Sequence, residues 1–218
     1  INLSDIPELG IWISCLGNNK NKSVFRLLIK TRTFGAHNLV VNLNEGRARE
    51  FIDEETRLLI IMSSSMYNKP LVENFGGYWP EYNLFSEEYI QEETLETYLD
   101  RNRNDIIDKS KVDRWQMRWL HFIWSGIQAY QEFWSRTDYK LSIQPPCPSN
   151  LVIPKHDYKL GTNIISISKR KNIHSISEHF LSLYTDFIIR TEKKYPGLQH
   201  MSDWEVIFTA TIQALKVK

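Results

Sequence analysis

One stretch, residues 112–154, decides how this chain folds, and its first part reads WQMRWLHFIWSGIQAYQEFWSR (Trp115–Arg136). The large apolar residues of this segment recur at steps of three and four, so they share one face of a helix with a period of 3.6 residues. They are Trp115, Trp119, Phe122, Ile123, Ile127, Tyr130 and Trp134. A face this broad and aromatic must be buried. The segment therefore predicts a long core helix.

A proline-rich loop, QPPCPSN (Gln144–Asn150), follows the helix and enters the apolar run Leu151–Ile153. Three prolines in four positions can continue neither a helix nor a central strand. Ser149 and Asn150 can turn the backbone through side-chain hydrogen bonds. We expect a stiff loop that presents Asn150, whose amide is able to contact a ligand. The alternative is that Asn150 only closes the turn, as such clusters between periodic segments ordinarily do.

Composition places the chain among ordinary globular proteins. Its 218 residues are 42% hydrophobic and 24% charged, which suits one sizeable core or two small lobes. A net charge of +1 gives no reason to expect nucleic acid or an anionic membrane as a partner. The longest apolar run, Leu58–Met62, is far shorter than the roughly 18 residues that suggest a membrane span. We therefore expect a soluble, cytoplasmic protein.

Metal and nucleophile motifs are missing from the sequence. Cys15 and Cys147 lie far apart without the spacing of metal ligands, and the six histidines form no zinc motif. There is no phosphate-binding P-loop and no nucleophile elbow, so these enzyme classes are not indicated. The chain begins with Ile rather than Met, which suggests one domain of a longer polypeptide.

The first 93 residues are rich in predicted strands. Alternating and β-branched runs predict strands over residues 10–17, 23–31, 37–44 and 84–90. An amphipathic pattern over residues 48–62 predicts the one helix of this part. We expect a loop over residues 63–80, in which Gly76–Pro80 exposes its aromatic side chains.

Helices dominate from residue 94 onward. Thr94 stands where its side chain can accept the first free amide hydrogens of a short helix, Thr94–Leu99. A β-hairpin is expected over residues 151–167. The remaining predicted segments are a charged connection over 101–111 and helices over 175–195 and 204–216. The sequence thus predicts an α+β fold with a strand-rich part, 1–93, and a helical part, 94–218.

This order of elements resembles the two-lobed protein-kinase-like fold, and in particular its small-molecule kinase branch. The resemblance is most specific at FSEEYIQEETL (Phe85–Leu95), at the core helix, and at Pro145–Ile153. It implies ATP and Mg²⁺ as cofactors, with Asn150 on the metal ion. It also implies a hinge at Glu88, Tyr89 and Ile90. A phosphate-pairing Lys30 is implied as well, with Glu54 or Glu55 as its helix partner and Arg47 as a distant substitute.

The sequence departs from the kinase pattern at the residues that carry the chemistry. Counting back five positions from Asn150, the catalytic Asp falls on Pro145, which cannot accept a proton. The metal-binding Asp falls near Ser166 or Ser168, and Asn42 stands on the third strand where a Lys is expected. The resemblance therefore implies a kinase-like domain without the usual acids, acting as a nucleotide-binding or regulatory module of a larger enzyme.

Two alternatives stay open. In the first, the chain is an active small-molecule phosphotransferase that uses a rearranged acid such as Asp157. In the second, it is a protein-interaction scaffold that binds no ligand. A fainter similarity concerns accessory domains of large bacterial proteins that also carry a phosphoenolpyruvate-synthase-like module. It is carried by residues 37–44, 74–82 and 157–161, and it implies other domains of a longer polypeptide as partners.

Overall fold

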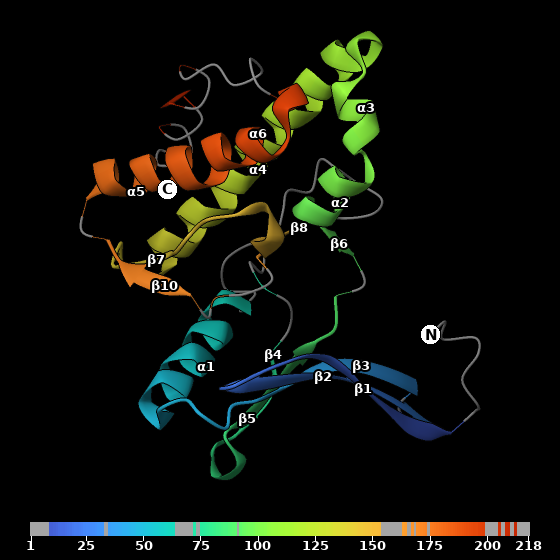
Figure 1. Cartoon of the computed structure of the whole chain (residues 1–218). Helices are drawn as coiled ribbons and strands as arrows, with labels where there is room; N and C mark the ends of the chain where they lie inside the picture. Colours follow the sequence, from blue (N-terminus) through green and yellow to red (C-terminus); the bar gives the residue numbers. More distant parts are fainter. Residues whose placement is uncertain are drawn as a thin grey trace. The chain divides into compact units, whose positions relative to one another are not determined.

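The computed structural model describes residues 9–32, 35–63, 72, 75–90, 92–153, 163–164, 167, 169–173, 175–198, 205, 208–209 and 212. The chain divides into two compact units, unit 1 (Ile1–Gln91) and unit 2 (Glu92–Lys218). Unit 1 is built on a sheet and unit 2 on helices (Figure 1). The predicted α+β fold is confirmed.

Unit 1 contains a five-stranded antiparallel sheet with the strand order β1-β2-β3-β5-β4. The strands are β1 (Gly10–Asn19), β2 (Lys22–Thr31), β3 (Gly35–Leu43), β4 (Phe75–Trp79) and β5 (Leu84–Glu88). One helix, α1 (Arg49–Ser63), follows β3, and a short helical turn, η2 (Pro80–Tyr82), links β4 to β5. The strands predicted at 10–17, 23–31, 37–44 and 84–90 and the helix at 48–62 are all present, with shifts of one or two residues at most ends.

Helix α1 packs on one face of this sheet. Its buried side chains include Ile52, Leu58 and Leu59. The Tyr78 hydroxyl of β4 donates a hydrogen bond to the Asp53 carboxylate of α1, so the helix lies on the face to which Tyr78 points. Strand residues alternate between the two faces. Residues paired directly across neighbouring strands lie on the same face of the sheet. The helix-covered face therefore also includes Phe85, which pairs with Tyr78, Asn42, which pairs with Phe85, and Val24, which pairs with Asn42.

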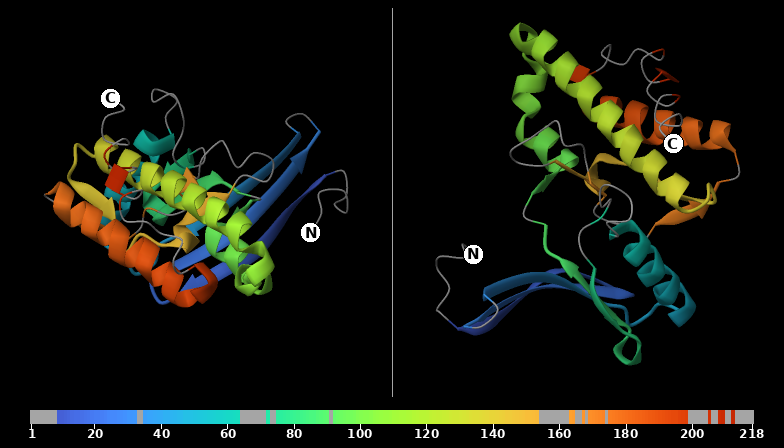
Figure 2. Two further views of the ribbon diagram at one scale, coloured as in Figure 1. Left: turned by 90° about the horizontal axis from the view of Figure 1, so that it is seen from above. Right: turned by 180° about the vertical axis from the view of Figure 1, so that it is seen from behind.

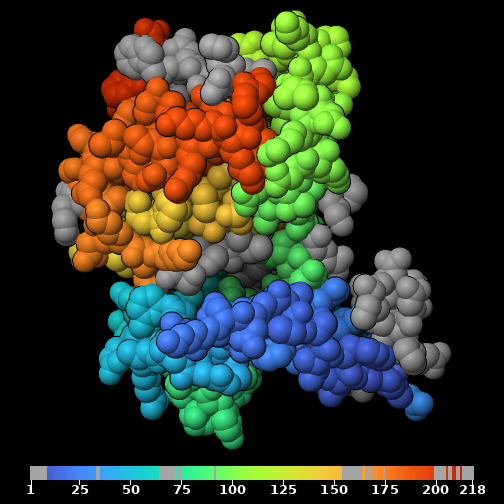
Figure 3. All heavy atoms as spheres, in the orientation of Figure 1, coloured from blue at the N-terminus to red at the C-terminus, as the bar shows by residue number. Residues whose placement is uncertain are grey.

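Strand β1 forms one edge of the sheet and is mostly exposed. Figure 3 shows the β1–β2 hairpin, in blue, at the surface. Ile11 and Ile13 are 65% and 68% exposed, whereas Trp12 between them is half-buried. This alternation is that of an edge strand with one face turned toward a core.

The prediction of a loop over residues 63–80 is wrong at its C-terminal end, because β4 occupies Phe75–Trp79. Glycine pairs usually indicate turns, but here glycine permits a close approach of two strands. A Cβ atom on Gly76 would lie 2.5 Å from Ser86 Oγ of β5. Trp79 is exposed as predicted, whereas Tyr78 is half-buried by its contact with α1.

Unit 2 is organised around α4 (Val112–Arg136), the predicted core helix. Every residue of the predicted apolar face is at most 4% exposed. A helical run made of α5 (Ile176–Ser182), η6 (Leu183–Ile189) and α6 (Arg190–Lys194) lies beside α4 (Figures 1 and 2). The rings of Trp119 and Phe187 are 6.1 Å apart. Gly126 of α4 lets this run come close, because a Cβ atom there would lie 2.7 Å from the Phe187 ring.

The other elements of unit 2 surround α4. They are β6 (Glu93–Thr94), α2 (Leu95–Arg101), α3 (Arg103–Ile107), η3 (Lys109–Lys111), β7 (Leu141–Ile143), η4 (Pro148–Asn150), β8 (Leu151–Ile153), β9 (Asn163–Ile164), β10 (Arg170–Asn172), α5 (Ile176–Ser182), η6 (Leu183–Ile189), α6 (Arg190–Lys194) and η7 (Pro196–Leu198). Thr94 caps α2 as predicted, since its hydroxyl accepts a hydrogen bond from Thr97 N at 3.2 Å. Among the described residues, no helix is long and apolar enough to cross a membrane.

The structure of unit 2 differs from the sequence-based prediction in three places. Residues 101–111 form short helical segments rather than a plain connection. The strand β8 pairs with β9, as the predicted hairpin required, but it pairs with β6 as well, and β7 and β10 form a further pair. The helix predicted over 175–195 is present, with the π-helical segment η6 in its middle. Most of the helix predicted over 204–216 lies outside the described residues.

Candidate functional site

Charged and amide side chains gather on the helix-covered face of unit 1. They come from β2, β3, the β3–α1 connection, α1 and β5, and they are Lys22, Asn42, Arg47, Glu55 and Glu87. The sheet supplies Lys22, Asn42 and Glu87 because all three occupy positions that point toward α1. We refer to these five residues as the Lys22 cluster.

Glu55 is the most buried charge of the Lys22 cluster. It is 2% exposed, and its Oε2 atom lies 2.7 Å from Nη1 of Arg47. This contact is an ion pair without the angles of a hydrogen bond, since Oε2 has no hydrogen-bond donor. Arg47 also donates to Asn44 Oδ1 at 3.2 Å and lies 4.1 Å over the Phe51 ring. Arg47 is thereby fixed as the partner that neutralises Glu55.

The surroundings of the Lys22 ammonium group differ from those of Glu55 and Arg47. No described residue forms a hydrogen bond or an ion pair with its ammonium group, which lies 5.4 Å from the centre of the Phe85 ring. Burial lowers the pKa of Lys22 below its usual range, although Glu55 and Glu87 act in the opposite direction. The cluster therefore contains one partly desolvated cation whose three donors are not used by the described part of the protein.

Asn42 occupies the position of β3 where the kinase resemblance leads one to expect a lysine. Its side chain is buried, and Nδ2 donates to Oε1 of Glu87 at 3.1 Å. An amide is uncharged, so Asn42 cannot balance an anion, but it holds Glu87 in place beside Lys22.

Two backbone amides of the turn between β1 and β2 already have an acceptor within the turn. The Asn19 side-chain oxygen accepts hydrogen bonds from the backbone N–H groups of Asn21 and Lys22, both at 3.0 Å. These are the groups that a glycine-rich loop would direct toward phosphates. An anion bound at this end of the sheet therefore cannot use these two amides unless it displaces the Asn19 side chain.

Two of the residues predicted to pair with phosphate, Lys30 and Glu54, are not members of the Lys22 cluster. Lys30 is at the opposite end of β2 from Lys22, paired in register with Gly10 and Ala36. Glu54 is exposed on α1, whereas its neighbour Glu55 is buried and bound to Arg47. Of the two glutamates considered for the helix partner, Glu55 is thus the one inside the charged cluster.

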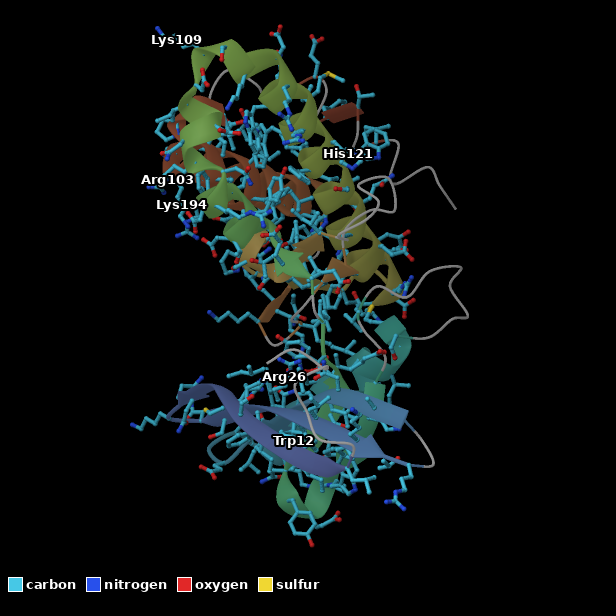
Figure 4. The ribbon with its side chains drawn as sticks, turned by 90° about the vertical axis from the view of Figure 1, so that its right-hand side faces the viewer. Trp12, Arg26, Arg103, Lys109, His121 and Lys194 are labelled. Carbon is cyan, nitrogen blue, oxygen red and sulfur yellow. The ribbon has the colours of Figure 1, made fainter. Side chains whose placement is uncertain are left out.

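The predicted hinge lies at the end of β5. Glu88 is exposed, and the Tyr89 N–H donates to the Asn38 carbonyl at 2.8 Å. Arg26 of β2, labelled in Figure 4, lies 4.1 Å over the Tyr89 ring. No hydrogen bond of Ile90 to another described residue is present. Among the described residues, the Tyr89 N–H thus has an acceptor and the Ile90 N–H has none.

In unit 2 the predicted metal residue, Asn150, lies at the end of η4. Its backbone N–H donates to the Cys147 carbonyl at 3.0 Å and closes the turn. Its half-buried side-chain amide forms no hydrogen bond with a described residue. The Tyr130 hydroxyl holds the same loop, because it accepts from Cys147 N and donates to Cys147 O, both at 2.9 Å. The main chain closes the turn, and the Asn150 amide is left available.

Replacing Tyr130 with phenylalanine tests this anchoring. We expect a loss of roughly 1–3 kcal/mol in the free energy of unfolding, because the Cys147 N–H and C=O would lose their shared partner inside the protein. Urea unfolding measures the change. Tyr184→Phe is the matched control, since Tyr184 stacks on Phe180 without a hydrogen bond to a described residue, and it should change stability by less than about 0.5 kcal/mol. Equal losses in both variants would contradict the anchoring role.

The described residues do not make a magnesium site. They contain no group of three or more His, Cys, Asp or Glu side chains placed to hold a metal ion. Asn150 offers one amide oxygen, whereas Mg²⁺ takes six oxygen ligands. Asp157, Ser166 and Ser168 lie outside the described residues, so the catalytic role of Asp157 stays a prediction.

Comparisons of the sequence with protein-family models and with curated proteins found no match. The sequence did not indicate Lys22 as a member of the charged site, and it indicated Arg47 only as a distant substitute for the phosphate-pairing lysine. Alternation along β2 could have placed Lys22 on the same face as Lys30, but nothing in the pattern indicates which of the two lies near the buried Glu55.

Proposed function

We propose that this chain is a kinase-like domain that binds a nucleotide without transferring its phosphate, and that it serves as a regulatory module of a larger enzyme. The order of the described elements supports the proposal. Three strands, a helix and two strands come first, followed by a short capped helix, a long core helix, the Asn150 loop and a strand pair. This is the order that the kinase resemblance implies.

The observation that carries the proposal is the state of the proline loop. It has a group for binding, the Asn150 amide, which no described residue occupies. At the position of the catalytic acid it has Pro145, which can neither accept nor donate a proton. Tyr130 fixes the loop through Cys147, which favours this geometry over a rearranged one. A loop of this kind suits binding and not proton abstraction.

The experiment is a direct binding measurement combined with an activity assay. Calorimetric titration with ATP and with ADP, each with and without Mg²⁺, should show saturable binding. Incubation with ATP, Mg²⁺ and a panel of hydroxyl and amine acceptors should show no turnover. Turnover would favour the active phosphotransferase instead. No binding of any nucleotide, together with no thermal stabilisation far above micromolar concentrations, would favour the ligand-free scaffold.

Asn150→Ala is expected to weaken nucleotide binding by roughly tenfold to a hundredfold, because a hydrogen bond to a charged ligand group contributes roughly 1.5–3 kcal/mol. The free energy of unfolding should change by no more than about 0.5 kcal/mol, since the amide has no partner in the described protein. Calorimetry and urea unfolding on the same preparation measure both quantities.

Asn104→Ala, at an exposed position of α3, is the control and should leave both quantities unchanged. A variant of Asn150 that is strongly destabilised, yet binds nucleotide normally in its folded fraction, would show that the side chain only closes the turn.

A further inference from the structure

We propose that Lys22, and not Lys30, is the residue of unit 1 that binds the phosphates of a nucleoside polyphosphate. The inference deepens the proposed function and rests on it. Both lysines lie on β2 and point to the same face of the sheet, because they are eight residues apart on a strand that pairs with β3 without a bulge. What separates them is the charged environment at each end of the strand.

The two carboxylates near Lys22 already have other partners. Glu55 has its ion pair with Arg47, and Glu87 accepts a hydrogen bond from Asn42. The ammonium of Lys22 keeps three donors without a described partner, in a half-buried position beside the Phe85 ring. Burial disfavours a charged ammonium, and a bound anion would offset that cost.

The other cations on this face are less suited to the role. The Arg26 side chain is engaged, because Nε donates to Asn38 Oδ1 at 3.0 Å and the guanidinium lies on Tyr89. Arg47 is held by Glu55 and Asn44. Lys30 lies at the far end of β2, roughly 27 Å from Lys22 at about 3.4 Å per residue. Of the described cations near Glu55, Lys22 alone combines partial burial with unused donors.

The chemistry of the site suits an anion rather than a neutral ligand, and the proposed function makes that anion a phosphate. An ammonium on a flexible stem acts as a point charge for phosphate oxygens and needs no planar partner. Two backbone amides of the β1–β2 turn are occupied by Asn19, whereas the side chain of Lys22 can supply positive charge to an anion. The expected ligand is therefore a nucleoside di- or triphosphate whose phosphates lie at the Lys22 end of β2.

Four lysine variants and one labelling experiment test the inference. By calorimetry, Lys22→Met should raise the Kd for ATP by roughly tenfold or more, whereas Lys22→Arg should keep part of the affinity. The Kd for adenosine, which has no phosphate, should not change. Lys20→Met, an exposed lysine of the same turn, is the charge-matched control and should stay within about twofold of the wild type, as should Lys30→Met.

The labelling experiment uses the wild-type protein, so it does not depend on the folding of a variant. A lysine with a lowered pKa reacts faster with an acylating reagent at neutral pH, because more of it is unprotonated. ATP should protect Lys22 from acylation and leave Lys20 unprotected, as read by mass spectrometry. Inorganic tripolyphosphate should give the same protection.

The outcomes separate the two proposals. Nucleotide binding that Lys30→Met abolishes and Lys22→Met leaves within twofold would overturn the assignment of Lys22 while the proposed function stands. Protection of Lys22 by tripolyphosphate, with no binding of any nucleotide, would keep the anion site and overturn nucleotide binding. No protection by either ligand would overturn the inference.

Discussion

Replacing Arg47 with methionine should lower the free energy of unfolding of unit 1 by about 3 kcal/mol, because it leaves a buried carboxylate without its counter-charge. Glu55 is 2% exposed, and its Oε2 lies 2.7 Å from Arg47 Nη1. Urea unfolding followed by circular dichroism measures the loss. Hydrogen exchange of the β2 and β5 amides should assign it to unit 1.

A double variant separates the missing charge from the missing packing of Arg47. Arg47→Met combined with Glu55→Gln removes both charges and should recover most of the stability, because replacing a buried pair with uncharged groups is often close to neutral. Glu55→Gln alone should cost less than Arg47→Met, since Arg47 keeps Asn44 as a partner and is the more exposed member of the pair. A double variant as unstable as Arg47→Met would show that the packing of Arg47 over Phe51 was the larger contribution.

Unit 2 should lose roughly 3 kcal/mol of stability as the pH falls from about 6.5 to about 4, through His179 alone. Burial lowers the pKa of His179 to about 4. An unfolded histidine binds its proton near pH 6.5, whereas the folded one stays neutral until about pH 4. Between these values the unfolded state holds one more proton, so stability rises with pH, is complete above 6.5 and is lost on acidification.

The surroundings of His179 explain why it resists protonation. The side chain is fully buried, its Nδ1 lies 3.0 Å from Ser142 Oγ, and its ring stacks on Trp134 at 4.5 Å. Its Nε2 atom has no hydrogen-bond partner among the described residues, so a proton added there would place an unpaired charge in the core.

The measurement is urea unfolding of the wild type and of His179→Gln at several pH values between 4.5 and 7. Glutamine does not titrate, so the difference in slope between the two proteins isolates the histidine from the carboxylates that both share. The expected result is a steeper fall in stability for the wild type over this range. Parallel slopes would mean that His179 titrates normally in the folded protein.

Much of the fold could be predicted from local pattern. The face of α4 is visible as a period of 3.6 residues that runs unbroken from Trp115 to Trp134, and a helix that long has no other way to bury its tryptophans. The cap of α2 is equally local, because Thr94 needs only the amide three residues ahead of it. Alternating apolar residues likewise identified β1, β2, β3 and β5.

Strand pairing depended on partners far away in the chain. Residues Phe75–Trp79 look like a turn because of Gly76 and Gly77, and they form a strand because β5 offers its edge and Ser86 leaves room only for glycine. The strand β8 was predicted as part of a hairpin, but its pairing with β6 was not. The two residues of β6 have no pattern of their own to specify a strand.

The sequence by itself determined which residues form the long helix and which side chains of β2 share a face, because both follow from periods of 3.6 and 2 residues. Tertiary structure decided which end of that face carries the buried charges. Lys22 and Lys30 occupy equivalent positions in the alternation, and only the packing of α1 places Glu55, with Arg47, at the Lys22 end. The reason is physical: a repeat fixes the direction in which a side chain points, whereas its electrostatic partners come from elements that are distant in sequence and adjacent only after folding.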